Sequence, residues 1–329
     1  MIRKGMWRML AVFLLVLIPA RTVVLLLPEG ETGSLWGAIL PWCYLVGAVA
    51  LFLSCRLDHR AVMRFRPRPC PAAGLASVLS GVTVLVASLY ALIRMVRKES
   101  DATAVSLAGD QPLLSSLCAV AGLLAAVVFL AWGASLLRTG ALFREYPVVA
   151  LMPPIWACLE LTVLFITYTA QSEIIKNFYS ILPFALGLLF LFGQSSFFSD
   201  AGGGAARRKL YQYGAPFVLV GLGSSVPSLI CLALGRESGS SLPAPMLIAL
   251  LFLSLYAAAA MAALRRDTNL LLRSGRGTSP IRRTDPSLSV TLELDRVVAD
   301  WKQMNHLESA GDTGKQDPLS VSGDQGKDS

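Results

Sequence analysis

The stretch LLSSLCAVAGLLAAVVFLAWGASLL, residues 113–137, decides the fold class because it contains no charged side chain. An α-helix rises about 1.5 Å per residue, so about 20 apolar residues cross a hydrocarbon layer roughly 30 Å thick. Inside a bilayer the backbone finds no water to bond, and this run lacks the alternation of apolar and polar residues that a barrel strand would show. The stretch therefore predicts a transmembrane α-helix.

Seven more runs of the same kind occur along the chain. The sequence of 329 residues is 54% hydrophobic and only 15% charged, which is typical of a membrane protein and not of two soluble domains. We therefore expect an all-α, polytopic integral membrane protein, with residues 1–264 forming a bundle of eight transmembrane helices. The predicted spans are about 7–27, 34–54, 73–94, 113–137, 149–170, 176–196, 213–235 and 243–264.

The positions of Lys and Arg predict the orientation. If the N-terminus is cytoplasmic, 23 of the 29 basic residues fall in inside segments and five in outside loops, with Arg21 inside the first span. This bias predicts that both termini are cytoplasmic. Short loops without an N-x-[ST] acceptor suit the cytoplasmic, or plasma, membrane of a bacterium. The net charge of +8 then reflects topology and attraction to the lipid bilayer, so no nucleic-acid partner is expected.

The first span could instead be a signal peptide, since MIRKGMWR is basic and an apolar run follows. However, Ile18 stands two residues before Ala20, where a cleavage site requires a small residue. The apolar run also resumes after Arg21 as TVVLLL, which favours an uncleaved span.

The C-terminal tail has three predicted parts. Residues 265–287 form a basic juxtamembrane linker, residues 288–306 an amphipathic helix, and residues 307–329 a disordered tail. The amphipathic helix could bury its apolar face in the membrane interface, against its own bundle, or on a protein partner. The face that would dock comprises Val290, Leu294, Val297 and Trp301.

Arg21 and Glu160 are the two formal charges well inside the predicted spans. Glu160 stands in the apolar run ACLELTVLF, residues 157–165. A charge at the bilayer centre costs about 2.5–3.5 kcal/mol on insertion scales, so such residues usually face the bundle interior and pair. Because the two residues lie at similar depths, we expect an ion pair that joins the first and fifth helices.

Prolines interrupt several spans, and each frees a backbone carbonyl that needs another partner. Pro-broken segments in two halves of a chain indicate a binding site in transporter-like folds. The candidate site, for a solute or a proton, therefore comprises Arg21, Glu160, Pro41 and Pro183. A purely structural ion pair is the alternative. Pro19, Pro153 and Pro154 also interrupt predicted spans.

The stretch GLGSSVPS, residues 221–228, is small and hydroxyl-bearing, which indicates either close helix packing or the polar wall of a pore. A second basic segment could bind lipid head groups, or could serve only as a topology signal. Its candidate residues are Arg56, Arg60, Arg64, Arg66 and Arg68.

Catalytic chemistry is not indicated. His59 and His306 lie alone outside the spans, and the sequence contains no metal-spaced Cys/His cluster and no pair of carboxylates within the spans. We therefore expect no metal and no cofactor, and the sequence favours a non-enzymatic function. The favoured function is a small permease or transporter subunit. The alternatives are a membrane scaffold or sensor that acts through the C-terminal helix and, less favoured, a membrane-embedded lipid enzyme.

Overall fold

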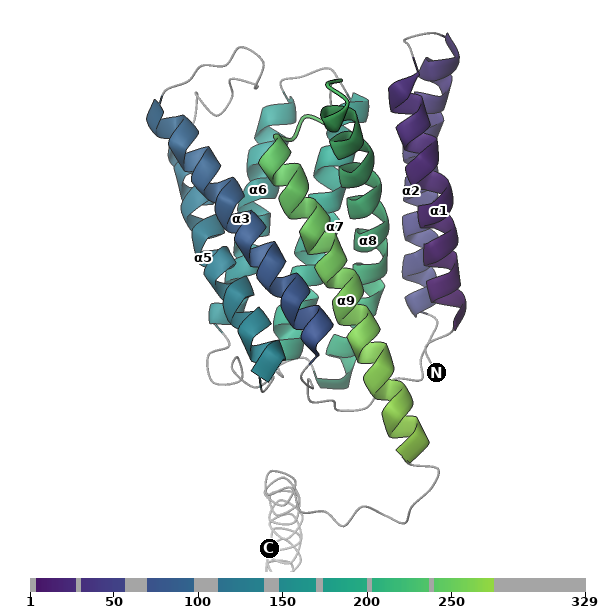
Figure 1. Ribbon diagram of the computed structural model, residues 1–329, viewed down its shortest axis with the longest axis vertical. Coiled ribbons are helices and arrows are strands. Elements are labelled where there is room, and N and C mark those ends of the chain that lie inside the picture. The colour runs from purple at the N-terminus through teal and green to yellow at the C-terminus, as the bar shows by residue number, and fades with distance from the viewer. Residues whose placement is uncertain are drawn as a thin grey trace, which may run out of the picture. The chain divides into compact units, whose positions relative to one another are not determined.

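The computed structural model describes residues 4–27, 31–56, 70–97, 112–138, 148–169, 174–199, 203–236 and 240–274. Within these ranges the regular structure is entirely helical (Figure 1). The elements are α1 (Lys4–Leu26), α2 (Glu31–Arg56), α3 (Pro71–Arg97), α5 (Pro112–Arg138), the 3-10 turn η1 (Val149–Leu151), α6 (Met152–Thr169), α7 (Ile174–Phe198), α8 (Gly203–Ala233) and α9 (Ala244–Ser274).

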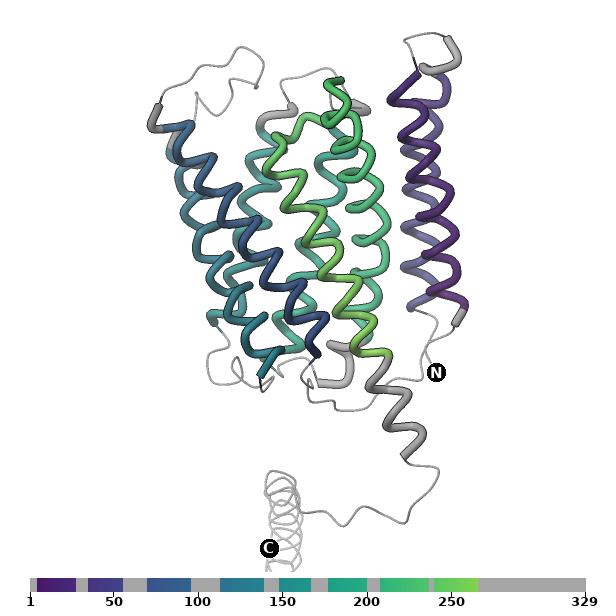
Figure 2. The backbone as a smooth tube through the Cα atoms, in the orientation of Figure 1, coloured from purple at the N-terminus to yellow at the C-terminus, as the bar shows by residue number. Residues whose placement is uncertain are grey.

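The prediction of eight membrane-spanning helices is confirmed, because each of the eight α-helices is long and apolar enough to cross a bilayer. The helices that extend furthest beyond their predicted spans are α8, which begins at Gly203, and α9, which continues to Ser274 (Figure 1). Figure 2 traces the eight helices as a tube through the Cα atoms. Apolar content marks only the part of a helix that lies in lipid, whereas backbone hydrogen bonding can continue into water. The amphipathic helix predicted at 288–306 and the tail at 307–329 lie outside the described residues.

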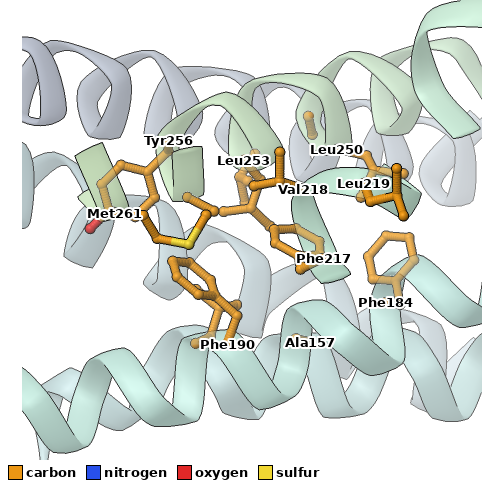
Figure 3. Packing of buried hydrophobic residues seen from close by; sticks show 14 of the residues in the cluster. Ala157, Phe184, Phe190, Phe217, Val218, Leu219, Leu250, Leu253, Tyr256 and Met261 are labelled. Atoms are coloured by element: carbon orange, nitrogen blue, oxygen red, sulfur yellow. The ribbon is translucent and has the colours of Figure 1, made fainter. Parts of the chain in front are cut away.

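Helix α8 is the most deeply buried of the eight spans. It packs against α1, α2 and α7, and Tyr211 on α8 donates a hydrogen bond of 2.8 Å to the carbonyl of Met261 on α9. Its glycines permit these close approaches, since a Cβ at Gly221 would lie 2.1 Å from Ser254 Oγ. Figure 3 shows the apolar core beside α8, where the rings of Phe190 and Phe217 stack with centroids 5.7 Å apart.

Helices α3 and α5 pack through small residues. A Cβ at Gly74 would lie 3.0 Å from the carbonyl oxygen of Gly133, and one at Gly133 would lie 2.8 Å from that of Gly74. Two turns further along α3, a Cβ at Gly81 would lie 3.1 Å from the Ala126 carbonyl oxygen. Ser77 Oγ also donates to the Phe129 carbonyl at 2.8 Å. Small residues at such spacing are typical of membrane helices that approach backbone to backbone.

The end of α8 is tied to the end of α1. Gly235, two residues after the end of α8, adopts φ 71°, and the amides of Gly235 and Arg236 bond back to the carbonyls of Leu232 and Cys231. This pattern is a Schellman cap, which favours glycine because other residues are strained at positive φ. Arg236 Nη1 then donates to the Leu26 carbonyl at 2.5 Å. The cap therefore aims Arg236 at the C-terminal carbonyls of α1.

Candidate functional site

Arg21 is 2% exposed, although it is a charged residue inside the first span. Its Nη1 donates a hydrogen bond of 2.7 Å to the carbonyl of Gly223 on α8. Its guanidinium also lies over the ring of Tyr179 on α7, with Cζ 3.4 Å from the ring centroid. A cation over an aromatic face is stabilised by roughly 2 kcal/mol or more when both are removed from water. Arg21 thus connects α1 to α7 and α8.

Tyr44 on α2 completes the cluster. It is fully buried, and its hydroxyl donates to the Leu17 carbonyl on α1 at 3.0 Å. The same hydroxyl lies 3.5 Å from the Gly223 carbonyl oxygen, at the outer limit for a hydrogen bond. Its ring meets the ring of Tyr179 edge to face, with centroids 5.7 Å apart. We call Arg21, Tyr44, Tyr179, Gly223 and Ser224 the Arg21 cluster.

Gly223 is required for the ring of Tyr44 to fit. A Cβ at Gly223 would lie 2.2 Å from Tyr44 Cε1 and 2.6 Å from Tyr44 Oη, which is closer than any real contact of that kind. The absence of a side chain therefore lets both Tyr44 and Arg21 reach the backbone of α8.

Two prolines explain why backbone carbonyls are available in the middle of α7 and α8. Proline has no N–H, so the carbonyl four residues before it loses its helical partner. Pro227 lies four residues after Gly223, and Pro183 lies four residues after Tyr179. Arg21 bonds the carbonyl of Gly223, and Ser224 Oγ donates to the carbonyl of Tyr179 at 2.6 Å. Side chains of the Arg21 cluster thus satisfy both freed acceptors.

Two buried polar atoms on α7 have no hydrogen-bond partner among the described residues. The hydroxyl of Tyr179 and Oδ1 of Asn177 are buried, and neither makes a hydrogen bond in the described part of the structure. A buried polar atom without a partner costs about 1–3 kcal/mol, so native structures seldom leave one without a reason. The hydroxyl of Tyr179 therefore marks the Arg21 cluster as a place where a further polar group could bind.

Glu160 lies elsewhere. It is half-buried on α6, and its carboxyl group adjoins the thiol of Cys118 on α5 and the indole of Trp156. The ion pair that we expected between Arg21 and Glu160 is not among the contacts described for either residue: Arg21 meets Gly223 on α8 and Tyr179 on α7, whereas Glu160 adjoins Cys118 and Trp156. The reason is lateral position: α1 packs against α2 and α8, while α6 packs against α5 and α7. Equal depth says nothing about which helices are neighbours.

The predicted prolines are placed as follows. Pro41 is buried in α2, one turn before Tyr44, and Pro183 is buried in α7, one turn after Tyr179. Pro41 and Pro183 thus lie within one turn of Tyr44 and Tyr179, which the sequence analysis did not single out. Pro153 and Pro154 do not interrupt a helix, since they stand in the first turn of α6, where proline is well tolerated.

Several other predictions cannot be placed. Arg56 ends α2, whereas Arg60, Arg64, Arg66 and Arg68 lie outside the described residues, as do the four residues of the C-terminal docking face. In the described ranges no three His, Cys, Asp or Glu side chains gather in a way that could hold a metal ion.

Comparisons of the chain with family models, curated proteins and solved structures find no match. The chain is a multi-pass membrane protein by the evidence of its own helices.

Proposed function

We propose that this protein is a small permease or transporter subunit whose solute site is the Arg21 cluster. The observation that carries the proposal is the meeting of a buried arginine with two proline-freed carbonyls on adjacent helices. In transporter folds, solute sites lie where spanning helices are interrupted near the midplane, because broken helices expose backbone groups that can bind a solute.

The chemistry of the cluster supports this role. Arg21 supplies a cation, Tyr44 and Ser224 supply hydroxyls, and Tyr179 supplies both a ring face and a buried hydroxyl. Four helices, α1, α2, α7 and α8, contribute these groups. A rocking motion between the α1–α2 pair and the α7–α8 pair would open the cluster without unfolding any helix.

We place the protein in a bacterial cytoplasmic membrane with both termini in the cytoplasm. The excess of Lys and Arg in the predicted inside segments supports this orientation.

The test is whether water-soluble reagents reach the cluster from both faces of the membrane. Ser224→Cys introduces a thiol into the Arg21 cluster with little change in size, in a background where the six native cysteines are replaced by alanine. The matched control is Ser254→Cys on α9. Ser254 is also a fully buried serine, but its hydroxyl bonds within its own helix, to the Leu250 carbonyl at 2.8 Å.

A membrane-impermeant methanethiosulfonate would be applied to sealed vesicles of each orientation, and modification would be measured by mass spectrometry. A solute site that opens to each face in turn predicts modification of Ser224→Cys from both sides, while Ser254→Cys stays unmodified. If Ser224→Cys reacts no faster than Ser254→Cys from either side, the cluster is a packing device and the transport proposal fails.

A further inference from the structure

Glu160 belongs to a second polar cluster, which is formed by α5 and α6. It lies on the line of α6 that also carries Ala157 and Leu164, both buried, at spacings of three and four residues. That line faces inward, yet Glu160 itself is only half-buried. The neighbouring positions Cys158 and Thr162 are exposed on the perimeter, where acyl chains would lie. Glu160 thus lies inside the membrane span, at the margin of the buried face of α6.

The described neighbours of the Glu160 carboxyl group come from α5 and from α6 itself. Cys118 on α5 presents its thiol to the carboxyl group, and Trp156 lies one turn earlier on α6. Gly122 on α5 makes room for the indole, since a Cβ there would lie 3.0 Å from Trp156 Nε1. The same Cβ would lie 2.1 Å from the hydroxyl oxygen of Ser88 on α3. We call Cys118, Trp156 and Glu160 the Glu160 cluster; Ser88 adjoins Gly122 next to it.

One donor in this cluster faces the carboxyl group. The indole N–H of Trp156 is buried and lies beside the Glu160 carboxyl group, in a geometry that falls short of a regular hydrogen bond. Trp156 is held in place by packing, because its ring meets Phe184 on α7 edge to face with centroids 6.4 Å apart. A small shift of the flexible Glu160 side chain would therefore bring a carboxyl oxygen onto a fixed donor.

Titratable side chains are described on each helix around Glu160. Among the side chains described on α5 they are Cys118, which adjoins the carboxyl group, and Arg138, which is exposed at the helix end. Those described on α7 include only Tyr179, which faces Arg21. On α6 itself Cys158 is exposed, and on α3 Arg94 lies over the ring of Tyr90. No described cation forms a salt bridge with Glu160.

We propose that Glu160 is a reversible proton-binding site within the membrane. Inside a membrane span and without a nearby cation, a carboxylate is far more costly than a neutral carboxyl group. The neutral group has one O–H donor and a carbonyl acceptor, and the indole N–H of Trp156 can bond that acceptor. The step is an acid–base exchange: the carboxyl O–H bond breaks, its electron pair stays on oxygen, and the proton passes to water when the cluster opens. This site is separate from the Arg21 cluster and does not depend on its role.

The experiment uses a hydrophobic carbodiimide on the full-length protein in native membranes. The reagent adds the O–H of a protonated carboxyl group across its C=N bond and rearranges to a stable N-acylurea, which mass spectrometry locates. We expect labelling at Glu160, with a water-soluble carbodiimide giving none. Once the site begins to release its proton, labelling should fall by about tenfold per pH unit. Glu160→Gln should remove the label from that peptide and confirm its position.

Two variants test whether the side chains around Glu160 affect its proton binding. Trp156→Phe keeps the aromatic packing but removes the indole N–H beside the carboxyl group, and Cys118→Ala removes the adjoining thiol. Each should move the pH at which labelling is half lost. The proposal is overturned if Glu160 is not labelled at any pH, if labelling does not depend on pH, or if both variants leave the pH profile unchanged.

Discussion

Gly223→Ala should destabilise the bundle by breaking the fit between α2 and α8. The new Cβ would lie 2.2 Å from Tyr44 Cε1, 2.6 Å from Oη and 2.7 Å from Cζ. Tyr44 is fully buried, so its ring can move away only by disturbing its neighbours and its bond to the Leu17 carbonyl. Overpacking of this kind costs about 1–3 kcal/mol, and loss of one hydrogen bond about 0.5–1.5 kcal/mol.

The helix propensity of alanine offsets part of that loss. Alanine is favoured over glycine inside a helix by about 1 kcal/mol, so the net loss in free energy of unfolding should be about 1–3 kcal/mol. Gly193→Ala on α7 is the matched control, because the atom nearest its new Cβ lies at 3.7 Å, an ordinary contact. That variant should be as stable as the parent or slightly more stable.

The assay is unfolding by sodium dodecyl sulfate in mixed micelles, followed by far-ultraviolet circular dichroism. A double-mutant cycle sharpens it, since Tyr44→Ala removes the ring that the new Cβ would meet. In that background Gly223→Ala should no longer destabilise, which gives a coupling energy of about 2 kcal/mol. If Gly223→Ala is as stable as Gly193→Ala in the parent background, Tyr44 does not pack on Gly223, and the geometry of the cluster is wrong.

Three further predictions use the same unfolding assay. Ser224→Ala should lower the free energy of unfolding by about 1–3 kcal/mol, because it leaves the Tyr179 carbonyl unsatisfied. The loss should be smaller in a Pro183→Ala background, where residue 183 regains an N–H that can bond this carbonyl. Equal losses in both backgrounds would contradict the role given to Ser224. Arg21→Lys keeps the charge but removes the planar group that lies over Tyr179, so it should cost about 2 kcal/mol, and a neutral effect would show that the stacking is unimportant. Gly235→Ala has open space around its Cβ, so only the positive φ should matter, at about 1–2 kcal/mol, and no loss of stability would argue against the Schellman cap.

The spans could be predicted from the sequence because the bilayer imposes a simple requirement on long apolar helices. Burial of Arg21 could be predicted for the same reason, since lipid excludes a charge. The polar ends of α8 and α9 were missed because hydrophobicity marks the lipid boundary and not the helix boundary.

The proline rule could have taken the prediction further. Counting back four residues from Pro227 and Pro183 identifies the carbonyls of Gly223 and Tyr179 as acceptors that need donors. Ser224, next to Gly223, was part of a stretch already recognised as small and hydroxyl-bearing. What the count does not supply is which donor reaches which carbonyl.

The partner of Arg21 could not be deduced because sequence gives depth along the membrane normal but not position around the bundle. Glu160 matched Arg21 in depth, yet α6 and α1 pack against different helices. Tyr44 carried no distinguishing signal, because a tyrosine in a span is equally suited to the membrane interface. Only the packing of Gly223 against its ring distinguishes the two cases.

The separation of the two intramembrane charges is tested most directly by a double-mutant cycle of Arg21→Gln and Glu160→Gln, measured as free energies of unfolding in mixed micelles. Residues that share no partner should show additive effects, within about 0.5 kcal/mol. A coupling above about 1 kcal/mol would mean that the charges interact. The charges would also be shown to interact if exchanging the two residues restored more folded protein than reversing either charge alone. Either result would return Arg21 and Glu160 to one site and contradict the division into a solute site and a proton site.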